Sequence, residues 1–177
     1  RPLFIAACFV LEEGFPLASL KRITESMART ARQAGVLIVT GDTKVVEKGC
    51  GDGLYITTTG LGEALPGIRV SGRLARPGDQ VLLSGSIGDH GMAVMSAREG
   101  FAFGSGILSD SAPLNTLVEA ICRAAPHVRV LRDPTRGGLA ATLNEIAHQS
   151  GAGILLEESA IPVHDDVAQA CEFLGLD

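Results

Sequence analysis

The chain has 177 residues, of which 46% are hydrophobic and 20% charged, an ordinary composition for a folded globular protein. No apolar run approaches the roughly 18 residues that a membrane span requires, so the composition excludes a membrane-spanning helix. The net charge is -5, and one Tyr with no Trp leaves little for stacking on bases, which argues against nucleic acid as a partner.

The four cysteines lie far apart and form no C-x-x-C pair, so neither a zinc site nor a disulfide framework is indicated. This pattern favours a reducing cytoplasm. We expect Cys50, between two glycines, to be exposed and Cys8, Cys122 and Cys171 to be inert core thiols.

The first third of the chain predicts a strand, a helix and two further strands. Leu3–Leu11 is an apolar run of strand length. Residues 17–34 carry apolar side chains at helical spacing, and Gly35 is placed to end that helix. A second buried strand is predicted at Val36–Val39, and the alternation of Leu54–Thr59 predicts a third strand. We expect the three strands to form one sheet packed against the helix.

A domain boundary is predicted in residues 60–79, which contain five glycines and two prolines. We place it so that residues 1–67 and 68–177 belong to different domains. Strands and helices alternate afterwards, which predicts an α/β unit. Helices are expected at 89–99, 113–125, 138–149 and 166–176, strands at 80–84, 128–131 and 153–158, and a loop at 101–110.

The first candidate site is VTGDTKVVEKGCGDG, which begins in the second predicted strand and spends four glycines on fifteen residues. Asp42 is expected just past that strand, at a sheet end of the kind where α/β proteins bind ligands. A carboxylate suits Mg²⁺, and Lys44 or Lys48 could contact phosphate oxygens. The alternative is a polar loop whose aspartate caps a turn and whose lysines are solvated.

The second candidate site is RDPTRGGLAATLNEI, in which Gly137 and Gly138 open a helix. Free N–H groups at such a helix start, together with Arg136, form an anion site. The alternative is a helix capped by Asp133 or Thr135, with the glycines serving close packing.

The third candidate is the strand-to-helix turn SGSIGDHGMAVMSAREG. Asp89 is expected to be the N-cap of the helix, and His90 could be a base or a ligand. His127, His148 and His164 share no ligand spacing and are expected to be surface or packing residues. No Walker P-loop, dinucleotide-binding fingerprint, serine-hydrolase elbow or zinc-protease motif occurs.

These motifs, in this order, resemble the HypE family of hydrogenase maturation proteins. The resemblance is carried by AACFVLEEGFPLASLKRI, VTGDTKVVEKG, SGSIGDHGMAVMSAREGF, RDPTRGGLAATLNEIA and GILLEESAIPV. The family is grouped with aminoimidazole ribonucleotide synthetase, selenophosphate synthetase and thiamine-monophosphate kinase. The resemblance implies a PurM-like α+β fold, with an ATP-binding, dimer-forming N-terminal domain and a C-terminal α/β domain, both partial here.

The activity that the resemblance implies is ATP-dependent carbamoyl dehydration. A HypF-like carbamoyltransferase would load a C-terminal cysteine, and dehydration of the thiocarboxamide to thiocyanate would supply the cyanide ligand of [NiFe]-hydrogenase. ATP and Mg²⁺ are the implied cofactors, and a HypC–HypD complex and a second copy of the chain are further implied partners. The implied metal ligand is Asp42 and the implied catalytic residue is Lys44. The implied nucleotide-binding residues are Asp42, Thr43, Lys44, Asp133, Thr135, Arg136, Gly137 and Gly138.

The resemblance also implies that parts of the site lie outside the chain as given. The family's glycine-rich segment would precede Arg1, and its carbamoyl-accepting tail would follow Asp177, so we expect an internal piece of a longer protein that does not complete the reaction alone. Two alternatives stay open: a phosphate-transfer enzyme like selenophosphate synthetase, and a docking fragment for HypF or HypC–HypD without activity of its own.

Overall fold

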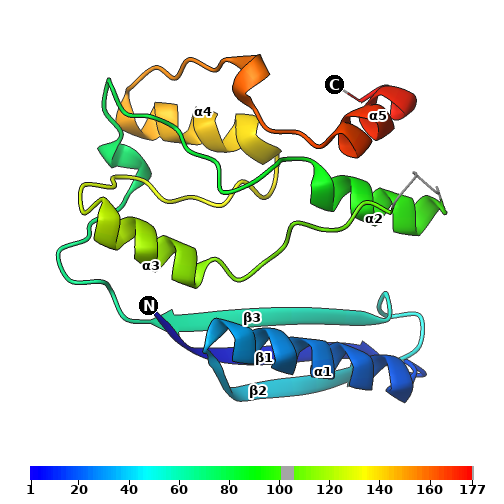
Figure 1. Ribbon diagram of the computed structural model, residues 1–177. Helices are drawn as coiled ribbons and strands as arrows, with labels where there is room; N and C mark the ends of the chain where they lie inside the picture. The colour runs from blue at the N-terminus through cyan, green and yellow to red at the C-terminus, as the bar shows by residue number, and fades with distance from the viewer. Residues whose placement is uncertain (101–105, 177) are drawn as a thin grey trace. The chain divides into compact units, whose positions relative to one another are not determined.

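A computed structural model describes residues 1–100 and 106–176. The chain divides into two compact units (Figure 1). The first unit comprises residues 1–68 and 113–127, and the second comprises residues 69–112 and 128–177. Within the described residues, no helix combines the length and the apolar character needed to cross a membrane.

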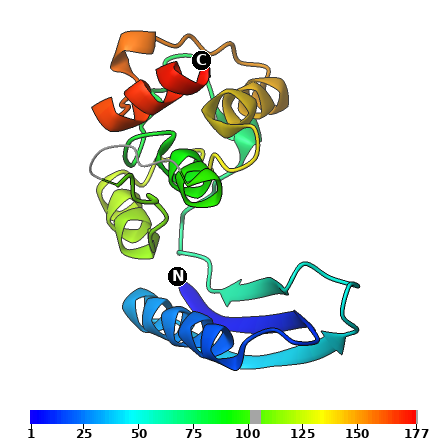
Figure 2. The same cartoon turned by 90° about the vertical axis from the view of Figure 1, so that its right-hand side faces the viewer.

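The first unit is a three-stranded sheet with a helix on one face (Figures 1 and 2). Its elements are β1 (Pro2–Glu12), α1 (Leu17–Ala34), β2 (Leu37–Val46), β3 (Leu54–Gly62) and α3 (Asn115–Ala124). The strand order is β2-β1-β3, with β1 parallel to β2 and antiparallel to β3. The prediction that these strands share one sheet is confirmed. Gly35 ends α1 with φ 65°, in the left-handed conformation that glycine adopts without strain.

The strands are much more exposed than predicted. Every residue of β2 from Leu37 to Val45 is exposed, and β1 buries only Ala7 fully. The physical reason is that a helix covers one face of the sheet only, and that β2 and β3 are both edge strands. Cys8 is exposed for the same reason, which corrects its prediction as a core thiol. Cys50 is exposed and Cys122 buried, as predicted, whereas Cys171 is half-buried.

The second strand continues well beyond its predicted end at Val39. It pairs with β1 as far as Val46 opposite Glu12. Gly41 makes this pairing possible, because a Cβ atom there would lie 1.9 Å from the carbonyl oxygen of Ala7. Asp42 is therefore inside a strand, opposite Cys8, and not in a loop at the sheet end as predicted.

The second unit is built from helices. They are α2 (Asp89–Glu99), α4 (Gly138–Ser150) and α5 (Asp165–Leu174), with 3₁₀ turns η1 (Gly72–Leu74) and η2 (Glu158–Ala160). Met92, Val167 and Ala170 form a buried cluster between α2 and α5. α4 buries Leu143 and Ile146. The five α-helices of the described residues form where predicted, with ends shifted by at most two residues, whereas η1 and η2 were not predicted.

None of the strands predicted at 80–84, 128–131 and 153–158 forms in the described part of the second unit. A strand needs a neighbour that accepts its ladder hydrogen bonds, and these apolar runs do not pair with one another. Leu82 and Leu155 are 86% and 96% exposed as a result. Residues 101–105 of the predicted loop at 101–110 lie outside the described residues. The combination of a helix-covered sheet with a helical unit confirms the predicted α+β class.

Candidate functional site

The residues Asp42 and Lys44 lie on the face of the sheet that α1 leaves open. Side chains alternate along a strand, and Asp42 and Lys44 stand opposite Cys8 and Val10 of β1. Cys8 and Val10 are exposed, whereas Ala7, the residue before Cys8, is buried, and Phe9, between Cys8 and Val10, is partly buried. Thr43 stands opposite Phe9, on the same side as Ala7. The strand therefore presents a carboxylate and an ammonium group together on an uncovered surface.

The carboxylate of Asp42 has room for a further ligand. Its Oδ1 atom accepts a hydrogen bond from the backbone N–H of Thr43 at 2.8 Å. Its other oxygen, and the ammonium group of Lys44, have no partner among residues 1–100 and 106–176. The same ranges contain no cluster of three or more potential metal-binding side chains. A single exposed carboxylate fits Mg²⁺, which proteins often hold through one or two carboxylates together with substrate phosphates.

The glycines of the loop after β2 surround a carboxylate that sequence reasoning missed. Glu12, at the end of β1, accepts hydrogen bonds from the backbone N–H groups of Gly49 at 2.6 Å and Gly53 at 3.0 Å. These two bonds hold the pKa of Glu12 below its ordinary value. Both glycines have positive φ, 86° and 74°, which aims their N–H groups at one acceptor. The partners are 37 and 41 residues away in sequence, so no local pattern pointed to Glu12.

The start of α4 has no side-chain cap. Gly137 occupies the N-cap position with φ 73°, and Gly138 follows with φ 62°. Neither Asp133 nor Thr135 caps the helix, which corrects that alternative. The loop instead makes backbone turns, from Thr135 N–H to Asp133 C=O at 3.1 Å and from Gly138 N–H to Thr135 C=O at 3.2 Å. Arg136 is exposed, without an ion pair in the described part of the chain.

The third candidate, the turn before α2, makes a buried polar contact inside the second unit. Gly88 is the N-cap of α2, so the prediction of Asp89 in that role is wrong. Asp89 is 4% exposed and accepts a hydrogen bond from Ser86 Oγ at 2.6 Å, while its other oxygen lies 2.7 Å from His164 Nδ1. Burial raises the pKa of Asp89, but the hydrogen bonds from Ser86 and His164 and the charge of His164 outweigh burial, so the pKa is lowered. His164 is thus a tertiary partner at the start of α5.

His90 has a partner of its own in the second unit. Its Nδ1 atom lies 2.9 Å from the hydroxyl oxygen of Ser109, which also accepts the backbone N–H of Ser111 at 3.1 Å. This contact orients the imidazole ring.

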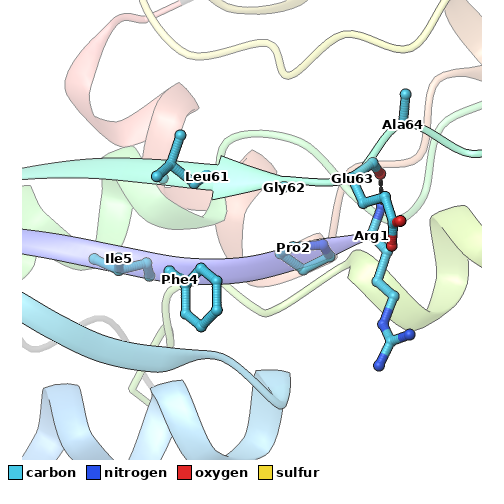
Figure 3. A pocket seen from close by; sticks show the side chains of 9 residues that line it. Arg1, Pro2, Phe4, Ile5, Leu61, Gly62, Glu63 and Ala64 are labelled. Carbon is cyan, nitrogen blue, oxygen red and sulfur yellow. Dashed lines mark hydrogen bonds between the residues drawn. The ribbon is translucent and has the colours of Figure 1, made fainter.

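A shallow hollow lies where β1 begins and β3 ends, at the pair Pro2 and Gly62 (Figure 3). Its volume is about 440 Å³, and Phe4, Ile5 and Leu61 give it an apolar lining. None of the predicted site residues lines it. The hollow therefore carries none of the chemistry that the sequence predicted.

The predicted site residues form two groups, one in each unit. Asp42, Thr43 and Lys44 are consecutive residues of β2 in the first unit. Residues 133–138, with Asp133, Thr135, Arg136, Gly137 and Gly138, form the turn that leads into α4 in the second unit.

Comparison with known proteins gives close relatives along the whole chain. Carbamoyl dehydratase HypE of Azotobacter vinelandii is 63% identical over 177 residues, which is 100% of this chain and 52% of that protein. A crystal structure of a HypE–HypF complex matches with a TM-score of 0.97 and 55% identity, over 100% of this chain and 58% of that chain. HypE in complex with ATP matches with a TM-score of 0.97 and 52% identity, over 100% and 53%. The chain thus spans about half the length of the curated relatives it matches.

Two family matches account for most of the chain. Residues 1–64 match the N-terminal domain of AIR synthase related proteins, and residues 76–176 match the C-terminal domain. The second match alone takes in more than half of the 177 residues. The chain therefore belongs to the AIR synthase related protein family.

Proposed function

We propose that the protein containing this chain catalyses the ATP-dependent dehydration of a C-terminal cysteine thiocarboxamide to a thiocyanate, which supplies the cyanide ligand of [NiFe]-hydrogenase. The observation that carries this proposal is the 63% identity, over all 177 residues, to a protein named carbamoyl dehydratase HypE. That identity favours the dehydratase over a phosphate-transfer enzyme or an inactive docking fragment. The similarity to a HypE structure containing ATP supports ATP as the co-substrate.

The two family matches support a division of this work between two domains. We propose that residues 1–67 belong to an ATP-binding, dimer-forming domain and that residues 68–177 belong to a C-terminal domain of the predicted α/β class, although its described residues form helices and none of the predicted strands. Four cysteines without a disulfide are compatible with a reducing cytoplasm, where we place the reaction.

On the first domain, Asp42 is proposed as the metal ligand and Lys44 as the catalytic residue. Bound Mg²⁺ would neutralise triphosphate charge, and the free oxygen of the Asp42 carboxylate is a suitable hard ligand for it. The ammonium group of Lys44, on the same open face, would stabilise negative charge that develops during transfer of the phosphoryl group. Thr43, between these two residues, is proposed to contact the nucleotide.

On the second domain, the turn before α4 is proposed to hold phosphate. The first turn of α4 has no side-chain cap, so its N–H groups other than that of Gly138, which donates to the carbonyl of Thr135, are available to an anion along the helix dipole. Arg136 adds a positive charge that no carboxylate neutralises in the described residues. Thr135 adds a hydroxyl group, and Asp133 a carboxylate at the entrance of the turn.

The proposed chemistry balances as the loss of one water from the thiocarboxamide. The amide oxygen attacks the γ-phosphorus of ATP and ADP leaves. The carbon–oxygen bond then breaks as phosphate departs, both amide protons are removed, and a carbon–nitrogen triple bond forms. Lys44 would stabilise the negative charge that develops on the phosphoryl group in the first step. A general base is needed to remove the two amide protons.

A HypF-like carbamoyltransferase is the proposed partner that supplies the carbamoyl group, because a structure similar to this chain is a HypE–HypF complex. A HypC–HypD complex is the proposed acceptor of the cyanide group. We also propose a homodimer, since the open sheet face and its neighbouring edges expose Leu37, Tyr55 and Leu61 at 63%, 52% and 68%.

The test uses the full-length protein carbamoylated at its C-terminal cysteine. Addition of MgATP should remove one water from the C-terminal peptide, as measured by mass spectrometry, with release of ADP. Lys44→Ala should slow this loss, while Lys21→Ala, a change to an exposed lysine of α1, should leave it unchanged. ATP hydrolysis without any change of mass in the peptide would contradict the dehydratase. Sedimentation of the same protein tests the dimer.

A further inference from the structure

Two arginines lie at the turn before α4: Arg132 directly precedes residues 133–138, and Arg136 is inside them. One is paired with carboxylates and the other, within the described residues, is not. Arg132 makes two ion pairs, with Glu145 at 2.9 Å and with Asp133 at 3.2 Å. Arg136 lies four residues later, inside the turn. It is exposed and makes no ion pair in the part of the chain that the structure describes. The two arginines therefore differ in how much of their charge is available to a ligand.

The ion pair of Arg132 connects the turn to the body of the helix. Glu145 lies about two turns into α4 and 13 residues from Arg132 in sequence. The backbone bonds inside the turn are all short-range, and Gly137 and Gly138 have the greatest conformational freedom of any residue type. The ion pair with Glu145 therefore fixes the start of the turn at residues 133–138 to α4, the helix that this turn leads into.

The charges around Arg132 make it a poor ligand for phosphate. The hydrogen bond and the negative charge of Glu145 raise the pKa of Arg132, and Asp133 adds a smaller contribution in the same direction. Two carboxylates around one guanidinium leave a net negative cluster, which repels an anion. Arg136 keeps its whole charge for a ligand.

We propose that Arg132 is a positioning residue, which acts through Glu145 to hold the turn at residues 133–138 in the conformation that binds the phosphates of ATP. This role rests on the proposed function. Arg136 is then the arginine that contacts the nucleotide, and Arg132 does not.

The experiment is a charge exchange in the full-length protein. Arg132→Glu and Glu145→Arg should each weaken MgATP binding by roughly fivefold, because each variant breaks the ion pair and leaves two like charges facing each other. The double variant, in which the two charges are exchanged, should recover affinity to within about twofold of the wild type. Arg136→Ala should lose affinity that no change at position 145 restores. Titration calorimetry with MgATP gives the affinities, and steady-state kinetics gives KM and kcat separately.

Two controls separate positioning from general effects. Arg129→Glu removes the same charge and breaks another ion pair of the second unit, with Asp79, and should leave MgATP affinity unchanged. Arg132→Gln and Glu145→Gln test the same contact without charge reversal, and both should weaken affinity, by roughly twofold for Arg132→Gln and by less for Glu145→Gln, which also removes a negative charge that repels phosphate. These two glutamine variants replace the charge-reversed variants in the test if a reversed charge prevents folding.

The outcomes are distinct. An Arg132→Glu variant that loses affinity, with Glu145→Arg unaffected and no recovery in the double variant, would show that Arg132 contacts ATP itself and overturn the proposal. Single variants that lower only the melting temperature, with MgATP affinity intact, would also overturn it. Absence of MgATP binding by the wild-type protein would overturn the proposed function, and this role with it. Failure of the charge exchange in a protein that binds MgATP overturns the role of Arg132 alone.

Discussion

The Nδ1 atom of His164 lies 2.7 Å from the Oδ1 atom of Asp89, a carboxylate that is 4% exposed. The two residues are 75 positions apart, and their contact joins the start of α5 to the first turn of α2. The apolar cluster of Met92, Val167 and Ala170 lies between the same two helices. The polar contact and the apolar cluster therefore stabilise one helix pair.

Asp89→Asn should loosen this helix pair. The amide keeps the volume of the carboxylate but cannot accept hydrogen bonds from both Ser86 and His164, so one end of a buried side chain loses its hydrogen bond, at a cost of about 1–3 kcal/mol. Hydrogen exchange of the α5 amides in the full-length protein measures the change. Asp165→Asn, at an exposed acid in the first turn of α5, should cost less than about 1 kcal/mol. Equal effects of the two variants would contradict a special role for Asp89.

The stability that Asp89 contributes should depend on pH in one direction. Because its folded pKa is lowered, the contribution is present above the ordinary carboxyl pKa and is lost as the pH falls through the lowered value. Wild-type protection of α5 should therefore decline on acidification more than protection in the Asp89→Asn variant. The difference between the two proteins isolates this group from the other carboxylates. Parallel curves would contradict the prediction.

Glu12→Gln should release the loop between β2 and β3. The carboxylate accepts the N–H groups of both Gly49 and Gly53, whereas an amide has one oxygen for two donors. Amide exchange at these two glycines should become faster while exchange within β1 stays unchanged. Glu13→Gln removes the same charge one residue along and should not accelerate exchange at either glycine. Slow exchange in the Glu12→Gln variant would show that the loop is held by other contacts.

Gly41→Ala should destabilise the first unit. The new Cβ atom would lie 1.9 Å from the carbonyl oxygen of Ala7, so the backbones of β1 and β2 would have to separate, at a cost of about 1–3 kcal/mol. Gly60→Ala is the matched control, because Gly60 lies in β3 with nothing within 4 Å of the added atom. Urea denaturation of the full-length protein compares the two. Equal midpoints would contradict the close approach of the strands.

Much of this fold could be predicted from the sequence, because helices are encoded locally. Apolar spacing together with Gly35 gave both ends of α1, and the helices of the second unit also form where predicted. The strands were harder to predict. β2 continues past Val39 because Gly41 allows a close approach to Ala7, a tertiary contact that a strand pattern does not contain.

The sequence predicted which residues belong to the candidate site better than it predicted how they are arranged. Glycine-rich motifs marked β2 and the start of α4, but the sequence could not show that Asp42 lies within a strand. The contacts of Glu12, Arg132 and Asp89 join residues that are between 1 and 75 positions apart, and most of these separations are 13 or more, so spacing rules did not reveal most of the contacts. Similarly, the apolar runs after residue 79 indicated strands, but strands form only where a neighbour pairs with them.

The last prediction concerns Asp42 as a metal ligand. In the full-length protein, Asp42→Ala should weaken MgATP binding by about tenfold or more, because a hard oxygen ligand is lost and the triphosphate charge is less well neutralised. Binding of ATP in the presence of a chelator should change much less, since the carboxylate then has no cation to hold and its own charge repels phosphate. Asp52→Ala, an exposed acid of the loop after β2, is the control and should leave both affinities unchanged. Calorimetry with and without Mg²⁺ measures both affinities of the wild type and of each variant. If Asp42→Ala lowers the affinity for ATP equally in the two conditions, Asp42 shapes the site without holding the metal. If neither affinity changes, the open face of β2 is not the nucleotide site, and the ligands must be sought elsewhere in the full-length protein.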